Sequence, residues 1–410
     1  MSNWSLSWHG LRTVTELEIK QRIRSRRWIW ALLGWFILVG ALTSLVIWAA
    51  SAAVQPSVDG TPVGLQAGPF AFGLIVYLVL GLGLMIAPAF TATTINGDRS
   101  AGVLATLQAT RLSALEIVLG KLLAAWLTAL LFLVVVLPFI GWSMALGNIS
   151  LWQVVVTFLV MFAEVAVVCA IGLGFSAVIS RPAGAAMLTY LTVVVLSVVT
   201  VIVVGLSTLL LTRPQAVRVW GLTPHVAQAY QDQVDAAFAK DPNAVPPAPP
   251  VEKCTWYDRT DSTTRLDQVW WVMVANPFVV VADAAPLPPG AAQDLSHYIG
   301  RSSDPLALVR WGIRQMSLPP QTEIDECSDL YSNLPGFKVE RDSAGNVTVT
   351  TSSGTPVSVS PVKARIITVE DPVWPWGLGF HLAVGLGFMW VAVRRLRLPY
   401  GTLLRGNRVA

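Results

Sequence analysis

The segment Ala183–Leu211 reads AGAAMLTYLTVVVLSVVTVIVVGLSTLLL and holds no charged residue. It is longer than the roughly 20 helical residues that cross about 30 Å of hydrocarbon. Because backbone groups in lipid must be satisfied within the segment, we expect a helix. Five further runs share this character: Trp28–Ala50, Phe70–Thr91, Leu122–Leu146, Val154–Ile179 and Trp376–Val393. The sequence therefore predicts an all-α polytopic bundle of six transmembrane helices, with a partial re-entrant segment left open at 268–285.

Composition agrees with this prediction. Hydrophobic residues make up 54% of the 410 positions and charged residues 13%, whereas soluble globular chains carry roughly 25% charged residues. So few charges exclude an ordinary soluble protein. A signal peptide is the alternative for the first run, but that run exceeds the usual apolar core of about 7–15 residues. We expect an uncleaved span.

Basic residues near the span ends predict the orientation, because cytoplasmic loops are enriched in Lys and Arg. The loops at 51–69 and 147–153 contain neither residue. Outside the long segment 212–375, the basic residues lie before the first run, between runs two and three, between runs four and five, and after the last run: Arg12, Lys20, Arg22, Arg24, Arg26, Arg27, Arg99, Arg111, Lys121, Arg181, Arg394, Arg395, Arg397, Arg405 and Arg408. We therefore expect both termini to be cytoplasmic, in a bacterial plasma membrane.

The predicted organisation follows from that orientation. Residues 1–27 form a cytoplasmic N-terminus, 28–211 hold spans one to five, 376–393 form the sixth span and 394–410 a cytoplasmic tail. The intervening residues 212–375 are expected outside the cell as an extracellular α+β domain, with strands at 347–352, 357–362 and 364–369. Its two cysteines, Cys254 and Cys327, are a candidate disulfide, since an exported location permits one.

The segment Leu6–Arg27 predicts an interfacial helix. Its apolar residues Trp8, Leu11, Val14 and Ile19 lie on one side at helical spacing. Glu18 and Arg22 break the pattern, because they project towards this apolar arc. A basic flank that only stops translocation is the alternative.

The loop 92–121 is expected to turn at Asn96-Gly97. A short helix at Ser100–Ala109 then follows, with Val103, Leu104 and Leu107 on one face. Ser113 and Glu116 have the spacing of a capping box that starts the next helix. Such a helix suits docking to a soluble partner, and an ordinary connecting loop is the alternative.

This loop resembles that of type-2 ABC exporter permeases, in which an acidic/basic pair precedes T-L-x-x-L-x-A-T-x-L-S-x-x-E-I-x-x-G-K. The matching residues here run from Asp98-Arg99 through Leu112-Ser113 and Glu116-Ile117 to Gly120-Lys121. Asp98 and Ser100 replace the usual glutamates, and Arg111 replaces the usual proline. The segment Ala275-Asn-Pro-Phe278 is similar to one that these permeases carry before the last span.

The resemblance implies that residues 98–113 form a coupling helix, seated in a groove of an ABC ATPase subunit. Its expected contacts are Asp98, Arg99, Val103, Leu104, Leu107 and Arg111. It also implies two ATPase copies, a second permease subunit as homodimer or heterodimer, and an amphipathic or hydrophobic export substrate. Membrane lipid is the surrounding partner, and no nucleic acid is expected.

The chain is not expected to be an enzyme or to bind a cofactor. Gly120-Lys121 is followed by Leu122, so there is no P-loop, and ATP and Mg belong to the partner ATPase. The histidines His9, His225, His297 and His381 have no metal-ligand spacing, and no metal or catalytic residue is expected.

Polar residues within the spans carry weaker signals. Glu164 lies inside the fourth span, where an ionisable group lines a substrate path or makes an interhelical hydrogen bond. His381 in the sixth span carries the same signal more weakly, with a solvated histidine near the outer interface as the alternative. Gly172 and Ser176 are spaced for close helix packing.

Two other classes of protein remain open. A secondary transporter would show two similar halves with broken helices in corresponding positions. A membrane-anchored receptor or ectodomain enzyme would carry its site within 212–375.

Overall fold

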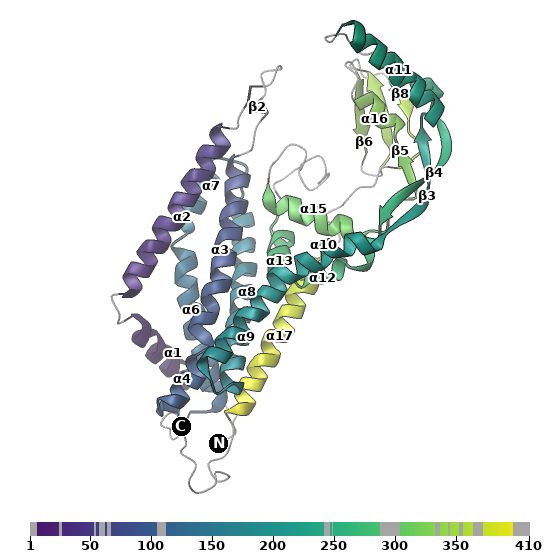
Figure 1. The fold of residues 1–410 in the computed structure, drawn as a ribbon. Helices are drawn as coiled ribbons and strands as arrows, with labels where there is room; N and C mark the ends of the chain where they lie inside the picture. Colours follow the sequence, from purple (N-terminus) through teal and green to yellow (C-terminus); the bar gives the residue numbers. More distant parts are fainter. Residues whose placement is uncertain are drawn as a thin grey trace. The chain divides into compact units, whose positions relative to one another are not determined.

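The computed structural model describes residues 6–23, 27–52, 55–56, 62–63, 67–104, 112–241, 247, 249–287, 304–332, 337–342, 345–351, 356–363 and 372–396. The chain forms two compact units (Figure 1). The helical unit comprises Met1–Val203, Trp271–Arg314 and Glu370–Ala410. The α/β unit comprises Val204–Trp270 and Gln315–Val369.

The helical unit is built around long apolar helices. Its elements are α1 (Trp8–Ile23), α2 (Arg27–Ala52), β1 (Gln55–Pro56), β2 (Pro62–Val63), α3 (Ala67–Thr91), α4 (Thr94–Ser100), α6 (Ala114–Val134), α7 (Leu137–Ala145), α8 (Leu151–Val178), α9 (Pro182–Val194), the π-helix η1 (Val195–Val199), α12 (Trp270–Val274), α13 (Pro277–Ala284), α15 (Pro305–Ser317) and α17 (Trp374–Arg395). Helix α10 (Thr200–Leu211) runs on from η1 and leads to the α/β unit.

The predicted spans are confirmed as six helices, among the described residues, long and apolar enough to cross a membrane. They are Trp28–Ala49, Gly68–Ser100, Ala114–Ala145, Leu151–Val178, Pro182–Leu211 and Trp374–Arg395. Helix α8 packs against α3, α6, α9 and α17, and Phe72, Leu80 and Met161 are fully buried in this core. The helical unit is thus a multi-pass membrane bundle in which α8 occupies a central position.

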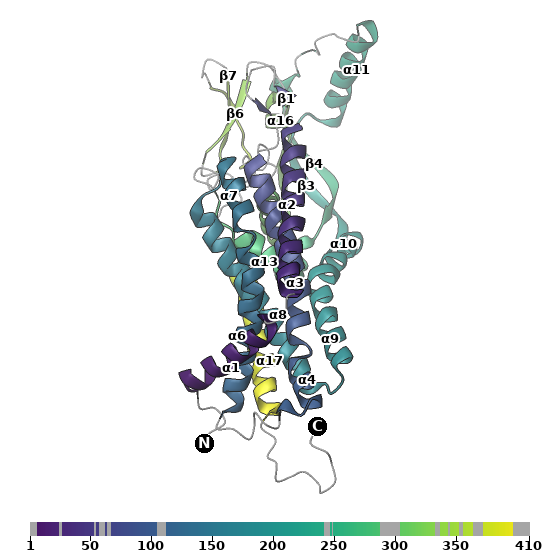
Figure 2. The same ribbon diagram turned by 90° about the vertical axis from the view of Figure 1, so that its left-hand side faces the viewer.

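The described residues of the predicted coupling loop lie at one end of the helical unit. Helices α1 and α4 and the carboxyl end of α17 lie there in both views (Figures 1 and 2). We call this the α1 end. Helix α7 lies towards the opposite end of the unit (Figure 1).

The predicted turn at Asn96-Gly97 is wrong, because both residues lie within α4. The chain turns at Ala92–Thr93, one turn after Pro88 of α3. It turns again at Gly102, whose φ of 72° lies in the region that favours glycine. Asn96 stays helical because its side-chain amide donates to the Ala92 and Ile179 carbonyls.

The segment left open at 268–285 forms two short helices, α12 and α13, instead of a full span. Helix α13 packs against α8 and α17. Asn276 caps it: its side-chain oxygen accepts from the Phe278 amide, and its nitrogen donates to the Ser197 carbonyl and the Thr200 hydroxyl. This cap ties α13 to the π-helix of the fifth span.

The α/β unit contains two small sheets. Its elements are β3 (Thr212–Gly221), α11 (Pro224–Lys240), η2 (Val251–Lys253), β4 (Thr255–Thr264), η3 (Leu266–Gln268), β5 (Glu323–Asp325), α16 (Cys327–Ser332), β6 (Phe337–Arg341), β7 (Val347–Thr351) and β8 (Pro356–Val359). One sheet has the order β4-β3-β5, with β4 antiparallel and β5 parallel to β3. The other is the antiparallel order β6-β7-β8.

The strands predicted at 347–352 and 357–362 correspond to β7 and β8, with β8 starting and ending earlier than expected. The third predicted strand, 364–369, lies outside the described residues. A disulfide joins Cys254 to Cys327. It lies in a small core with Leu222, Tyr331 and Val349, so it connects the start of β4 to α16.

Candidate functional site

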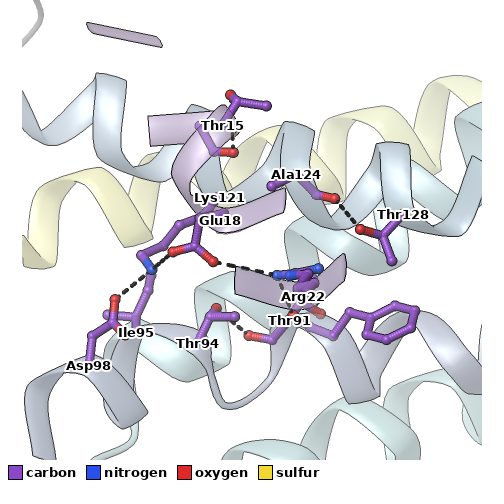
Figure 3. Close-up of polar contacts among 12 residues, drawn as sticks. Thr15, Glu18, Arg22, Thr91, Thr94, Ile95, Asp98, Lys121, Ala124 and Thr128 are labelled. Atoms are coloured by element: carbon purple, nitrogen blue, oxygen red, sulfur yellow. Dashed lines mark hydrogen bonds and ion pairs between the residues drawn. The ribbon is translucent and has the colours of Figure 1, made fainter. Parts of the chain in front are cut away.

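A buried lysine joins three helices at the α1 end (Figure 3). The Lys121 side chain of α6 is 0% exposed, and its ammonium lies 2.5 Å from carboxylate oxygens of Glu18 in α1 and Asp98 in α4. Arg22, one turn after Glu18, lies 3.8 Å from the same carboxylate and donates to the Phe90 carbonyl. Two cations and two carboxylates therefore balance around a fully buried ammonium, with Asp98 the most exposed of the four side chains. We call these four residues the Lys121 cluster.

Such a cluster fixes geometry more than it adds stability. Desolvating charges is costly, and their attraction offsets that cost only if each charge keeps its partner. Any movement of α4 away from α6 or α1 would separate Asp98 or Glu18 from Lys121. The three helices are therefore expected to move as one body.

Helix α8 supplies a second attachment for α4. The Ser176 hydroxyl accepts hydrogen bonds from the backbone amides of Ile95 and Asn96. These amides belong to the first turn of α4, where no intrahelical acceptor exists. Gly172, one turn earlier in α8, lies against Thr91, where a β-carbon would come within 2.1 Å of the Thr91 hydroxyl. The predicted close packing at Gly172 and Ser176 is thus confirmed, and it holds the break between α3 and α4.

Helix α1 crosses α6 closely at Gly120. A β-carbon there would come within 2.6 Å of the Val14 side chain, so only glycine permits this approach. The predicted capping box is confirmed at the start of α6, where Ser113 and Glu116 bond each other's backbone amides. The Glu116 carboxylate also accepts from the Ser7 amide just before α1.

The residues predicted to contact an ATPase differ in how far their side chains are exposed. Asp98 is 26% exposed at its side chain and is paired with Lys121. Leu104 is buried in a cluster with Ile95 and Ile117, while Val103 is 42% exposed. Arg99 is half-buried. Leu107 and Arg111 lie outside the described residues.

A second polar site lies deep in the bundle. Glu164 of α8 and His381 of α17 are each 1% exposed, and the histidine Nδ1 lies 2.9 and 2.8 Å from the two carboxylate oxygens. Of the two readings of His381, the solvated one does not hold, because α8 and the α12–α13 turn cover the ring. A neighbouring cavity of about 10 Å³ has room for one water molecule.

The histidine's other nitrogen fixes its tautomer. Nε2 lies 2.9 Å from the Ala275 carbonyl, and a carbonyl only accepts hydrogen bonds, so Nε2 carries a hydrogen. The contact between Nδ1 and Glu164 then also needs a proton, located on either the imidazole or the carboxyl group. In both cases the pair has no net charge, which suits its apolar surroundings.

The sequence contained signals for both sites. Glu18 and Arg22 lie on the apolar side of α1, which indicates that each has a buried partner on another element. Glu164 and His381 were each recognisable as a polar residue within an apolar span. Their pairing was not recognisable, because the α/β unit separates them in the sequence.

Within the described parts of the chain, no group of three or more His, Cys, Asp or Glu residues is arranged to hold a metal ion. No protein-family model matches the chain, and no curated protein matches it. Among the described residues, the fold is that of a multi-pass helical membrane protein with six candidate spans and an α/β unit that contains a disulfide.

Proposed function

We propose that this chain is the permease subunit of an ATP-driven ABC exporter, with a separate ATPase docking at the α1 end. The Lys121 cluster is the observation that carries the proposal. A permease driven by a soluble ATPase needs its docking helix rigidly joined to its spans. Through Lys121 and Ser176, α4 is joined to α6, α1 and α8. A force on this segment would therefore move several spans together.

The resemblance of the loop to type-2 ABC permeases supports the same reading. Residues of the shared pattern make the contacts that organise this end: Ser113 and Glu116 cap α6, Gly120 admits α1, and Lys121 binds Asp98. In this proposal Val103 faces the ATPase, Leu104 anchors the loop, and Asp98 positions α4. ATP and Mg are held by the partner, and this chain has no catalytic role.

The basic residues favour an orientation with the α1 end in the cytoplasm, and in this proposal the α/β unit is outside a bacterial plasma membrane. The disulfide in the α/β unit supports this placement, since such bonds persist in exported domains. The fifth span leaves large apolar side chains exposed, among them Met187, Leu209 and Leu210. This surface suits contact with membrane lipid or a second permease subunit. An amphipathic or hydrophobic substrate would follow a path between the two subunits.

Co-purification tests the proposed ATPase partner. The variant Val103→Asp places a charge on an exposed apolar position at the α1 end, and we expect loss of the ATPase that co-purifies with the tagged wild-type chain. Leu146→Asp is the matched control: Leu146 is 40% exposed, against 42% for Val103, but follows α7 towards the opposite end. No ATPase with the wild-type chain, or equal loss in both variants, would refute the proposal.

Orientation has its own test. Ser100→Cys, Asn148→Cys and Asp232→Cys introduce thiols at the end of α4, after α7 and in α11. A membrane-impermeant maleimide applied to intact cells should label the latter two and spare Ser100→Cys until the cells are opened. The reverse pattern would invert the topology and exclude an ATPase at the α1 end.

The buried Glu164–His381 pair favours one alternative, a proton-coupled secondary transporter, because ionisable groups within spans often lie on proton pathways. That reading predicts substrate transport driven by a pH gradient in vesicles without ATP. Abolition of such transport by Glu164→Gln, with no ATPase bound, would support this alternative.

A further inference from the structure

A groove runs between α1 and α6 on the side of the helical unit. Its wall on α1 consists of Trp8, Leu11, Thr15 and Ile19, and its wall on α6 consists of Leu123 and Leu127. Its volume is about 450 Å³. The α1 residues are spaced three or four positions apart and so form one stripe along the helix. The two leucines are one turn apart on α6.

The crossing of the two helices creates this groove. They come into close contact where Val14 meets Gly120, and helices that cross at an angle diverge on either side of the contact (Figure 2). Leu11 and Val14 are buried near the crossing, whereas Trp8 is 78% and Leu127 is 40% exposed. Beyond the crossing, the groove between the two helices is therefore open, and apolar side chains line it.

Positive charge borders the apolar stripe. Arg12 and Lys20 also line the groove, together with Glu16, whose carboxylate lies 2.6 Å from the Lys20 ammonium. These three side chains carry a net charge of one positive unit. Two further cations of this region, Lys121 and Arg22, face inwards in the Lys121 cluster. The groove is thus an apolar slot with a cationic rim.

We propose that this groove binds an anionic phospholipid of the membrane. One acyl chain lies along Leu123, Leu127 and Ile19, and the phosphate lies beside Arg12 and Lys20. The α6 wall belongs to a membrane span, so bilayer lipid reaches the groove by lateral diffusion, and basic side chains near a membrane surface attract anionic headgroups. The inference rests on α6 crossing the membrane and is independent of any ATPase.

Native mass spectrometry of the detergent-purified full chain tests this site. The probes are phosphatidylglycerol and phosphatidylcholine with identical acyl chains. We expect the wild-type chain to retain phosphatidylglycerol more tightly than phosphatidylcholine. In Arg12→Gln the ratio of the two affinities should fall by about fivefold. In Leu127→Trp, which fills the groove, phosphatidylglycerol should bind at least about tenfold more weakly. Arg181→Gln and Leu159→Trp are matched controls, because both residues are exposed and lie away from the groove.

Equal retention of the two lipids by the wild-type chain would overturn the inference, as would retention unchanged in Leu127→Trp. A lipid-free chain that forms a dimer, with the dimer lost in Leu127→Trp, would assign the groove to a second copy and also overturn it. Circular dichroism of each variant excludes unfolding as the cause. Because lipid retention is measured on this chain alone, the result does not depend on whether an ATPase binds.

Discussion

The two units use charged side chains in opposite ways. In the helical unit, Lys121 and Asp283 have side chains that are 0% exposed, and each contacts oppositely charged partners on other helices. In the α/β unit, the pair Arg218–Glu323 is 58% and 47% exposed. The hydrogen bonds that Arg259 donates to Asp261 and Glu326 raise the pKa of Arg259 above its ordinary value, yet that cluster also remains more than one third exposed.

The difference follows from the surroundings of each charge. A charge inside an apolar bundle must have a partner, so its position dictates how helices meet. A charge on a wet sheet keeps water as an alternative partner, and its ion pairs contribute little. Ion pairs therefore define geometry in the helical unit, while the disulfide and a small apolar core do so in the α/β unit.

The largest effect should come from breaking the Lys121 cluster. Lys121→Met leaves the buried Glu18 carboxylate and the partly exposed Asp98 carboxylate without the Lys121 ammonium, and we expect a loss of about 3–5 kcal/mol of stability. Differential scanning fluorimetry in detergent would measure it. The triple variant Glu18→Gln/Lys121→Met/Asp98→Asn should recover most of the loss. Lys20→Met in the exposed pair with Glu16 is the control, with an expected change of no more than about 0.5 kcal/mol.

The disulfide should dominate the α/β unit. The double variant Cys254→Ser/Cys327→Ser removes a link between residues 73 positions apart, and losses of about 2–5 kcal/mol are typical for such bonds. Limited proteolysis of the full chain should then cut within residues 212–270 and 315–369 of the α/β unit while leaving the spans intact. Unchanged proteolysis there would mean that the apolar core alone holds the unit together.

An intermediate effect is expected at the buried Glu164–His381 pair. Glu164→Leu leaves the histidine Nδ1 without a partner and should cost about 1–3 kcal/mol. Glu164→Gln should cost less, because the amide donates to Nδ1 while Nε2 still donates to Ala275. Thermal unfolding of the two variants side by side provides the measurement. Equal losses would show that the shape of the side chain, and not its hydrogen bond, matters at this position.

The smallest effect should follow Arg218→Gln in the α/β unit. Both members of this pair are largely exposed, so we expect a change of less than about 1 kcal/mol. Arg218 also stacks over the Trp256 ring, and Arg218→Lys would separate the stacking from the charge. A loss in Arg218→Gln as large as that in Lys121→Met would contradict the contrast between the two units.

Much of the helical unit was predictable, for a physical reason. A span must be a continuous apolar helix, and that requirement is written in local sequence. The capping box at Ser113 and the small residues at Gly172 and Ser176 were also local patterns. The turn at Asn96-Gly97 was misjudged, because local turn propensity was outweighed by the Ser176 hydroxyl and the Ile179 carbonyl of another helix.

The sequence by itself determined the number and approximate limits of the spans, the basic residues that bias their orientation, and the cysteines available for a disulfide. Only the tertiary structure decided which residues meet: Lys121 with Glu18 and Asp98, and Glu164 with His381. Helix formation depends on neighbours a few positions away, whereas a buried charge is balanced by partners that the packing brings together from distant parts of the chain.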